Sequence, residues 1–274
     1  MNWGRKSNKG PITLLKILVI VFSIALLSVA LIFLNYHIRQ KVFFDLKPVA
    51  LKNCIMKRFG SANDGGYVMC ENLLNNVQSA YSYGIGGNDD WGCDVAKQYN
   101  LTVHQYDCFD TNQPVCTGGK FIFHTECIGA KSKKKDNKIF DTLSNQILKN
   151  NDQGKRLVVK MDVDGDEWFS LLFTPETVLS NIDQIVVEFH NWDFLLVFFN
   201  PIIKKLKKTF YIANVHFNNC CCPNKFLPSP IVFEVLFVNK KIGIINEAES
   251  KPILPNPLDA PNLPEKIDCL EQAF

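Results

Sequence analysis

A glycine-rich turn directly after an apolar stretch is the first place where this sequence could do chemistry. The stretch ends at Tyr83 and is followed by Gly84, Ile85, Gly86 and Gly87, and then by acidic residues. Glycine is needed where the backbone adopts a positive φ, or where a ligand must approach the main chain without a Cβ in between. Such a turn is typical of a nucleotide-binding loop, and an ordinary strand-to-helix turn can have the same composition.

A carboxylate after the next apolar stretch favours the nucleotide interpretation. Residues 101–107 predict a strand that ends on Asp107. The separation from Gly84 is close to the roughly 20 residues between a glycine fingerprint and the acidic residue that accepts hydrogen bonds from a ribose diol. An acidic residue at a strand end is common in α/β proteins, so the spacing supports this interpretation without establishing it.

Two further strands are predicted to end in ionisable residues. Residues 157–163 are almost entirely apolar, as expected for a strand covered on both faces, and run into an acidic segment. Residues 182–189 end beside Glu188 and His190. Because ligands bind at the carboxyl ends of strands in open α/β sheets, we expect these groups at one site. The candidates for acid–base chemistry are Asp162, Asp164, Glu188 and His190.

The sequence does not predict a metal site. It contains no pair of CxxC motifs, and residues 220–222 are three adjacent cysteines, too crowded to supply three ligands of one zinc ion. An EF-hand loop starting at Asp162 would need glycine at position 6 and glutamate at position 12, but Gly165 is at position 4 and Phe173 at position 12. We therefore assign no metal ligands.

The apolar stretches predict the elements that must position these residues. We expect an α/β fold in which seven strands form one Rossmann-like, doubly wound sheet. No crossover helix fits between the last two strands, so the last strand should be antiparallel. The predicted strands cover residues 79–83, 101–107, 120–128, 157–163, 182–189, 209–217 and 230–238. Helices are expected over 139–149 and 193–208, a hairpin within 54–70 and a solvated lysine-rich loop over 131–138.

The residues before the domain predict a membrane anchor. Ile17–Leu34 contains no charged residue and is long enough to cross a bilayer core of about 30 Å. A cleaved signal peptide is the rival interpretation, although the apolar run exceeds the usual length of a signal-peptide core. The predicted organisation is a tail at 1–11, a transmembrane helix at 12–35, a stem at 36–53, a folded domain at 54–248 and a proline-rich C-terminal tail at 249–274.

The ten cysteines predict an oxidising compartment. A chain with a membrane entry signal and this many cysteines favours disulfide bonds in a lumen, and residues 100–102 form an Asn-Leu-Thr glycosylation sequon. Basic residues flank the apolar run on both sides, so the positive-inside rule gives no orientation. We expect a type II, single-pass protein of the endoplasmic reticulum or Golgi with a lumenal domain. The net charge of +3 gives no argument for a nucleic-acid partner, and none is expected.

Together these motifs carry a family resemblance over residues 54–240. Their order resembles that of the class I S-adenosylmethionine-dependent methyltransferases. Residues 160–167 (KMDVDGDE) are similar to the Lys-Ile-Asp-Val-Glu-Gly-Ala-Glu signature of the FkbM type. The segments that resemble membrane-anchored methyltransferase-like proteins are 58–60 (RFG), 64–67 (DGGY), 83–86 (YGIG) and 89–91 (DDW).

Two positions depart from the pattern of these families. Ser82 and Tyr83 precede the glycines, where an acidic residue is usual, and Asp107 is followed by Cys108, where the FkbM type has Glu-Pro. Both departures lie in segments expected to bind the cofactor.

The resemblance implies S-adenosylmethionine as the cofactor and, as the methyl acceptor, an oxygen or nitrogen of a glycan, protein or small molecule. It implies that Asp107 holds the ribose hydroxyls and that Asp162 lies near the sulfonium and the acceptor. Asp164, Glu188 and His190 are then candidates for a base. The implied cofactor-binding residues are Tyr83, Gly84, Ile85, Gly86, Asn88, Asp107 and Asp162.

Two other functions remain open from the sequence. A lumenal glycosyltransferase would use Asp162 and Asp164 as an Asp-x-Asp motif that holds a metal-bound sugar nucleotide, although the fourth-strand signature accounts for the same residues. A non-catalytic domain would keep the fold for binding alone.

Overall fold

The computed structural model describes residues 10–190, 192–220, 222, 232–248 and 252–269. Its centre is a seven-stranded sheet with the order β11-β12-β10-β9-β3-β4-β5. The strands are β3 (Ser79–Tyr83), β4 (Thr102–Tyr106), β5 (Lys120–His124), β9 (Leu157–Met161), β10 (Ile182–Phe189), β11 (Phe210–Phe217) and β12 (Phe233–Asn239). Strands β10, β9, β3, β4 and β5 pair in parallel, and β12 is antiparallel to both of its neighbours. The predicted α/β class and the seven-stranded sheet are confirmed.

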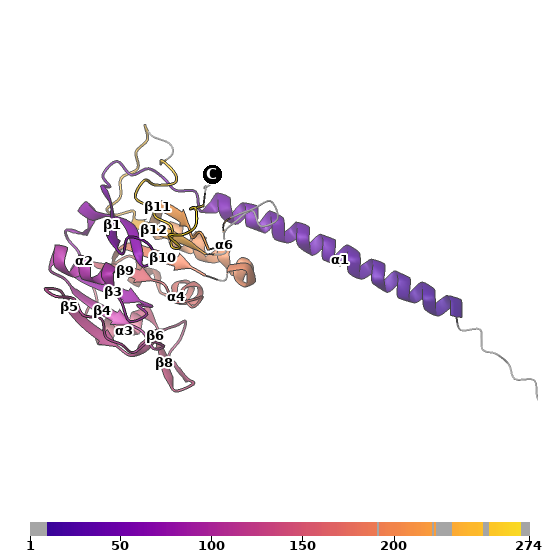
Figure 1. The fold of residues 1–274 in the computed structure, drawn as a ribbon, viewed down its shortest axis with the longest axis horizontal. Coiled ribbons are helices and arrows are strands. Elements are labelled where there is room, and N and C mark those ends of the chain that lie inside the picture. Colours follow the sequence, from indigo (N-terminus) through magenta and orange to yellow (C-terminus); the bar gives the residue numbers. More distant parts are fainter. Residues whose placement is uncertain (1–9, 191, 221, 223–231, 249–251, 270–274) are drawn as a thin grey trace, which may run out of the picture.

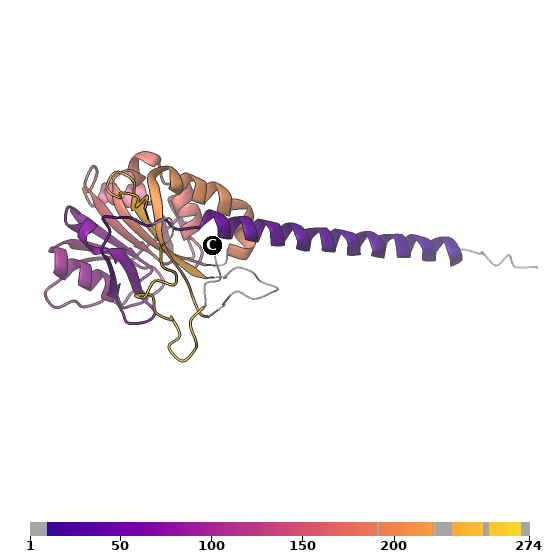
Figure 2. The same cartoon turned by 90° about the horizontal axis from the view of Figure 1, so that it is seen from above.

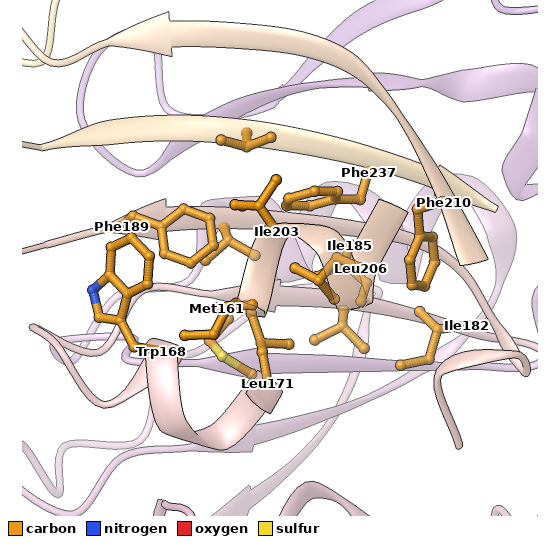
Figure 3. Packing of buried hydrophobic residues seen from close by; sticks show 14 of the residues in the cluster. Met161, Trp168, Leu171, Ile182, Ile185, Phe189, Ile203, Leu206, Phe210 and Phe237 are labelled. Carbon is orange, nitrogen blue, oxygen red and sulfur yellow. The ribbon is translucent and has the colours of Figure 1, made fainter. Parts of the chain in front are cut away.

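Helices cover one face of this sheet (Figure 1). They are α3 (Leu143–Lys149), α4 (Glu167–Phe173), α5 (Glu176–Leu179) and α6 (Trp192–Thr209). Trp168 and Leu171 of α4 and Leu206 of α6 pack in one cluster with Met161 and Phe189 of the central strands (Figure 3). All five residues of β9 are buried, which explains why this strand is almost continuously apolar.

A hairpin and one helix cover the other face. They are β1 (Met56–Gly60) and β2 (Gly66–Cys70), which pair antiparallel, and α2 (Asp90–Tyr99), with the short 3-10 helix η1 (Glu71–Leu74) after β2. Phe59, Tyr67 and Trp91 belong to the apolar layer on this side. The predicted hairpin is confirmed, and it becomes one wall of the candidate site.

The segment from 120 to 149 differs from its prediction. The strand expected over 120–128 breaks after β5, and β6 (Glu126–Ile128) joins a separate three-stranded sheet with β8 (Lys138–Asp141) and β7 (Lys133–Lys135). The lysine-rich segment is therefore a strand hairpin with exposed lysines instead of a loop. The helix expected from 139 begins at Leu143, because Thr142 caps it by accepting a 3.2 Å hydrogen bond from the backbone nitrogen of Asn145.

Helix α1 (Gly10–Asp45) extends away from the domain (Figures 1 and 2). Residues 15–34 of this helix are exposed. The segment Leu15–Ile38 is long and apolar enough to cross a membrane, a test that a signal sequence near the N-terminus also passes. The helix continues into the segment predicted as a stem. At its end, Leu46 is buried in the core and the Lys207 ammonium donates a 3.0 Å hydrogen bond to the Asp45 carbonyl.

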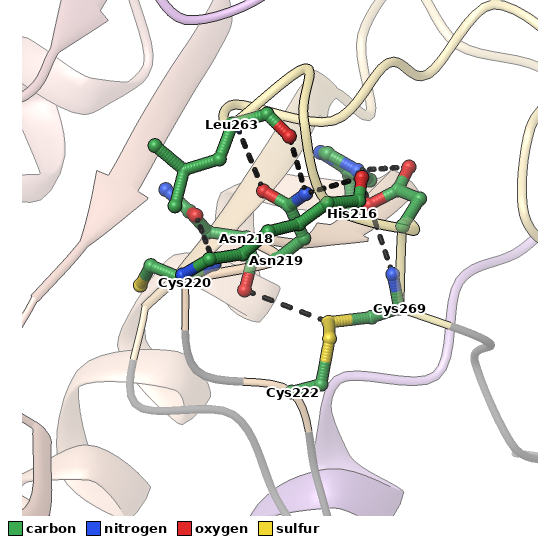
Figure 4. The surroundings of a disulfide bond; sticks show 9 residues. His216, Asn218, Asn219, Cys220, Cys222, Leu263 and Cys269 are labelled. Atoms are coloured by element: carbon green, nitrogen blue, oxygen red, sulfur yellow. Dashed lines mark hydrogen bonds and ion pairs between the residues drawn. A yellow bond between two sulfur atoms is a disulfide. The ribbon is translucent and has the colours of Figure 1, made fainter.

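Four disulfide bonds agree with the predicted oxidising compartment. They join Cys54 to Cys70, Cys93 to Cys116, Cys108 to Cys127 and Cys222 to Cys269. The last one ties the C-terminal segment 252–269, part of the predicted surface tail, to the residues after β11 (Figure 4). Asn219 fixes the same segment by donating to the carbonyls of Leu263 and Lys266. The C-terminal segment is thus an integral part of the domain, because a covalent bond and polar contacts hold it.

Candidate functional site

The glycine turn after β3 is fixed by contact with the end of β9. Gly84 and Gly86 have φ values of +69° and +52°, in the left-handed region. A Cβ at Gly84 would lie 1.5 Å from the carbonyl oxygen of Asp162, so only glycine fits there. Around Gly86, no heavy atom of the described residues lies within 4 Å of the corresponding Cβ position. Packing therefore dictates the first glycine, whereas the second faces open space that a ligand could fill.

Asp107 holds this turn in place from the end of β4. Its Oδ2 accepts hydrogen bonds from the backbone nitrogens of Ile85 and Gly86 at 3.1 and 2.9 Å. Its Oδ1 accepts from those of Phe109 and Asp110 at 2.9 and 3.0 Å. A carboxylate offers about four lone-pair positions as hydrogen-bond acceptors, and these four backbone N–H groups occupy them. The ribose diol expected at Asp107 would have to compete with them.

A cavity of about 470 Å³ lies beside the turn, at the carboxyl ends of β3, β4 and β9. Gly84 and Gly86 of the predicted site line it. Phe109 and Ile128 contribute apolar surface. Five aspartates also line it: Asp107, Asp162 and Asp164, which are predicted site residues, and Asp110 and Asp166, which are not. The cavity is therefore strongly acidic and suits a ligand that carries positive charge.

Three predicted cofactor residues lie outside the lining of this cavity. Tyr83 is fully buried beneath the turn, where its ring stacks on that of Tyr106 with 4.9 Å between centroids. Ile85 is buried as well, and the Asn88 amide donates to Asp90 at 3.2 Å. These residues shape the turn instead of facing the cavity.

The sequence interpretation missed several lining residues. Asp110 and Asp166 stand close in the sequence to Asp107 and Asp164, which were predicted site residues. The acidic character of these two segments could therefore have indicated them. Phe109 reaches the cavity because its backbone nitrogen is bonded to Asp107 and because the neighbouring Cys108 is joined to Cys127 across it. No sequence pattern indicates that disulfide pairing.

A second group of ionisable residues lies where β9 and β10 end. Asp162, Glu188 and His190 each place one possible ligand atom within 4.8 Å of the others. The His190 Nε2 is 3.2 Å from the Glu188 Oε1 and 3.8 Å from the Asp162 Oδ1. Three of the four predicted catalytic residues are thus brought together, and Asp162 belongs both to this cluster and to the cavity.

Asp164, the fourth predicted catalytic residue, stands at the rim of the cavity. It has a φ of +53°, and its side chain is 96% exposed. Its Oδ1 lies 3.9 Å from the His190 Nε2. The side chain can reach the cluster but is mostly in solvent.

His190 is surrounded by carboxylates. Burial alone lowers the pKa of this imidazole, but Glu167 and Glu188 outweigh burial and raise the pKa to about 11. At neutral pH His190 therefore carries its proton, and it cannot act as the predicted base without first losing it. Glu188 is the better proton acceptor, because burial raises the pKa of its carboxyl group.

Glu167 orients the imidazole from behind. This side chain is fully buried, and its Oε1 lies 3.5 Å from the His190 Nδ1 and accepts a 2.6 Å hydrogen bond from the His190 backbone nitrogen. Its Oε2 accepts from the Gly165 nitrogen at 2.8 Å. Sequence reasoning gave Glu167 no role, because only the fold shows that it turns inward to the end of β10.

Tyr67 and Lys160 orient Asp162. The Tyr67 hydroxyl donates to the Asp162 Oδ2 at 2.8 Å, and the Lys160 Nζ lies 3.3 Å from the same oxygen. Burial raises the pKa of Tyr67 well above its usual value, which keeps the hydroxyl a donor. Lys160 also donates to the carbonyls of Tyr83 and Gly84 at 3.2 and 2.7 Å. The glycine turn, β9 and the β1–β2 hairpin therefore meet at one carboxylate.

Two amides orient Glu188. The Asn218 amide donates to its Oε1 at 3.2 Å, and Asn262 of the C-terminal segment donates to its Oε2 at 3.5 Å. Asn262 also donates to Asp64 in the hairpin turn at 3.2 Å. The C-terminal segment thus forms part of the wall around the cluster.

A further ionic cluster lies between β11, β12 and the C-terminal segment. The His216 Nε2 is 3.1 Å from the Asp268 Oδ2, and its Nδ1 is 3.6 Å from the Glu234 Oε1. Burial lowers the pKa of His216, but Asp268 and Glu234 outweigh it and raise the pKa to about 11. This imidazolium neutralises carboxylates and attaches the C-terminal segment to the sheet.

Comparison with known proteins identifies no family. No family model matches the chain, and no curated protein matches it. Among solved structures, the chain is similar to the crystal structure of Thermoplasma acidophilum 1320, with 12% sequence identity and a TM-score of 0.30 over 74% of this chain and 98% of that one.

Proposed function

We propose that this domain is a class I, FkbM-like methyltransferase that binds S-adenosylmethionine in the cavity beside the glycine turn and methylates an oxygen or nitrogen of its acceptor. The observation that carries the proposal is the position of the cavity, at the carboxyl ends of β3, β4 and β9, where open α/β sheets bind ligands. The strand order and the antiparallel β12 support a Rossmann-like sheet of this class. The sequence segments that resemble the membrane-anchored methyltransferase-like proteins are the basis for proposing that family.

The residues of the cavity fit this cofactor. Gly86 leaves space at the turn that a side chain would fill, so a ligand can approach the backbone. The aspartates favour the positive charges of a sulfonium and an α-amino group. A volume of about 470 Å³ lies within the range of roughly 300–1,000 Å³ that is usual for small-molecule pockets.

In this proposal Asp162 and Glu188 act on the acceptor. When bound, S-adenosylmethionine supplies an electrophilic methyl group: a bond forms from the acceptor lone pair to the methyl carbon, the carbon–sulfur bond breaks, and its electron pair stays on sulfur. Tyr67 and Lys160 fix Asp162 at the boundary between cavity and cluster, where its charge can orient the acceptor. Glu188 takes up the proton that the acceptor releases.

We also propose that α1 is a signal anchor and that the domain faces the lumen of the endoplasmic reticulum or Golgi in type II orientation. The disulfides and the exposed apolar segment Leu15–Ile38 support this location. Asn100 of the sequon is exposed at the end of α2, where an oligosaccharide could be attached.

Calorimetric titration of the full chain in detergent, with its disulfides formed, tests the proposed function. We expect S-adenosylhomocysteine to bind and sugar nucleotides not to bind. A folded protein that binds no S-adenosylhomocysteine at millimolar concentration would overturn the proposal and favour a non-catalytic domain. Binding of a sugar nucleotide with manganese would favour the glycosyltransferase alternative.

A further inference from the structure

We propose that Asp162, Glu188 and His190 form a binding site for a divalent cation, for which Mn²⁺ is the matching probe. The three ligand atoms come from the ends of two adjacent parallel strands and lie within 4.8 Å of one another. Two carboxylate oxygens and one imidazole nitrogen suit a cation such as Mn²⁺, which prefers oxygen ligands and tolerates nitrogen. The sequence analysis expects these three residues at one site but assigns no metal ligands, because only the structure shows that their ligand atoms lie this close together.

The imidazole is oriented as metal-binding histidines are. Such histidines usually present one ring nitrogen to the metal and donate the other N–H to a carboxylate, which fixes the tautomer. Here the His190 Nδ1 lies 3.5 Å from the Glu167 Oε1, an ion-pair distance without a hydrogen bond in the described structure, and the Nε2 faces Asp162 and Glu188. Glu167 is fully buried and is itself anchored by the backbone nitrogens of Gly165 and His190, so it has no freedom to turn away.

The two carboxylates are also oriented before any cation binds. Tyr67 occupies one oxygen of Asp162, which leaves the Oδ1 directed toward His190. The amides of Asn218 and Asn262 hold Glu188. A site whose ligands are already ordered loses little side-chain entropy when a cation enters.

The charge of the cluster matches a divalent cation. Because only a neutral imidazole binds a metal, His190 must release its proton to solvent when the cation enters. The carboxylates of Asp162, Glu188 and Glu167 against the ammonium of Lys160 then leave two uncompensated negative charges. The Lys160 Nζ lies 3.3 Å from the Asp162 Oδ2, so its positive charge would repel a cation bound at that oxygen. Hydrogen bonds to two backbone carbonyls keep Lys160 in this position. The Oδ1 is therefore the oxygen that we assign to the cation.

A cation site here indicates which kind of atom accepts the methyl group. This inference rests on the proposed function. Asp162 borders both the cluster and the cavity, so a cation here would lie next to the acceptor. A divalent cation polarises a hydroxyl group and lowers its pKa. Because Glu188 is a ligand when the cation is bound, the proton then passes to solvent instead of to Glu188, and the oxygen becomes the nucleophile. We infer an oxygen acceptor, not a nitrogen acceptor.

Titration of the full chain with Mn²⁺ alone tests the site. The protein in detergent is first treated with a chelator, and the loss of the free Mn²⁺ signal is followed by electron paramagnetic resonance. We expect one Mn²⁺ per chain, with binding lost in Asp162→Asn and Glu188→Gln. Glu167→Gln should weaken binding about 10- to 100-fold, because it removes only the group behind the imidazole. Asp110→Asn is the matched control, since it removes a cavity aspartate outside the cluster and should leave binding unchanged.

The outcomes separate this proposal from the proposed function. No Mn²⁺ binding by the folded wild-type protein at millimolar concentration overturns the cation site, and so does Mn²⁺ binding that survives both Asp162→Asn and Glu188→Gln. S-adenosylhomocysteine binding, measured without Mn²⁺, reports on the cofactor cavity independently. Near-ultraviolet circular dichroism of each variant shows whether lost binding reflects the site or the fold, and a folded Asp162→Asn protein without Mn²⁺ binding supports the site.

Discussion

The Asp107 carboxylate lies 2.9 Å from the backbone nitrogen of Gly86, so the end of β4 holds the turn that follows β3. The same carboxylate binds the nitrogens of Ile85, Phe109 and Asp110. An acidic residue that the family resemblance assigns to the cofactor therefore also determines the shape of the cavity.

Asp107→Ala should lower both stability and cofactor affinity. It leaves backbone N–H groups around a largely buried position without an acceptor, and each such group costs about 1 to 3 kcal/mol. We expect the free energy of unfolding to fall by at least about 2 kcal/mol, as measured by urea denaturation. Asp164→Asn changes a side chain that is 96% exposed, keeps a residue type that tolerates the φ of +53°, and should change stability little. Equal stability of the two variants would contradict the structural role of Asp107.

Gly86→Val should abolish binding of S-adenosylhomocysteine. A valine side chain would occupy the open space at the turn, in the position where the ligand is proposed to lie. Gly154→Val is the matched control, because Gly154 also has a positive φ, +75°, and open space at its Cβ position within the described structure. Both variants carry the same backbone strain, so equal binding by the two in calorimetry would exclude the cavity as the cofactor site.

His216→Gln should destabilise the protein most at acidic to neutral pH. The folded pKa of His216 is raised to about 11, against about 6.5 in the unfolded chain, so its contribution is fully present below the unfolded value and is lost as pH rises toward 11. Urea denaturation at several pH values between 6 and 10 should show a difference from wild type that shrinks with rising pH.

His124→Gln is the control for this pH dependence, because the pKa of His124 is lowered whereas that of His216 is raised. Burial lowers the pKa of His124, so the neutral imidazole belongs to the folded state and the wild type loses stability as the pH falls. The difference between this variant and the wild type should therefore change at acidic pH instead of between neutral and alkaline pH. A His216→Gln difference that is independent of pH would show that this imidazole is not charged in the fold.

Removing the disulfide of the C-terminal segment should be costly. Cys222 and Cys269 are separated by 47 residues, for which the chain-entropy estimate of the stabilisation is about 4 kcal/mol. We expect Cys222→Ala/Cys269→Ala to lower the free energy of unfolding by about 2 to 4 kcal/mol and to loosen Asn262 at Glu188. Cys54→Ala/Cys70→Ala, which opens a 16-residue separation in the hairpin, should cost less in the same denaturation assay.

Expression in cells, followed by preparation of intact microsomes, tests whether the domain is lumenal. If the domain is lumenal, the exposed Asn100 should carry an oligosaccharide, and Asn100→Gln should abolish the mobility change caused by endoglycosidase. The domain should also resist added protease until the vesicles are opened with detergent. Digestion in closed vesicles, together with an unmodified Asn100, would place the domain in the cytosol.

The sequence predicts the central strands of the fold well, because each is marked by a run of apolar residues within the strand itself. Strand β9 is a short run of buried apolar residues bounded by polar ones, and its bounds are within two residues of the prediction. The prediction of one helix over 139–149 was wrong, because Ile139 and Phe140 fit a helical period but pair with β6 as strand residues. Pairing with a distant segment outweighed the local pattern there.

The candidate site was predictable only in part. Residues at strand ends, such as Asp162 and Glu188, could be found because parallel strands bring their carboxyl ends to one edge. The roles of Glu167, Tyr67 and Asn262 could not, since each reaches the cluster through a turn, a hairpin or a disulfide-linked segment that has no sequence signal of its own.

The continuous helix α1 determines where the domain can work if Leu15–Ile38 spans a bilayer. Ile38, the last residue of that segment, is half-buried against the core of the domain, so the domain would lie directly at the membrane surface. Leu46 and Lys207 also attach the end of this helix to the domain, so it is not a flexible tether. Acceptors carried in the membrane would meet the protein by lateral diffusion in two dimensions, whereas soluble acceptors would have to diffuse to the membrane surface.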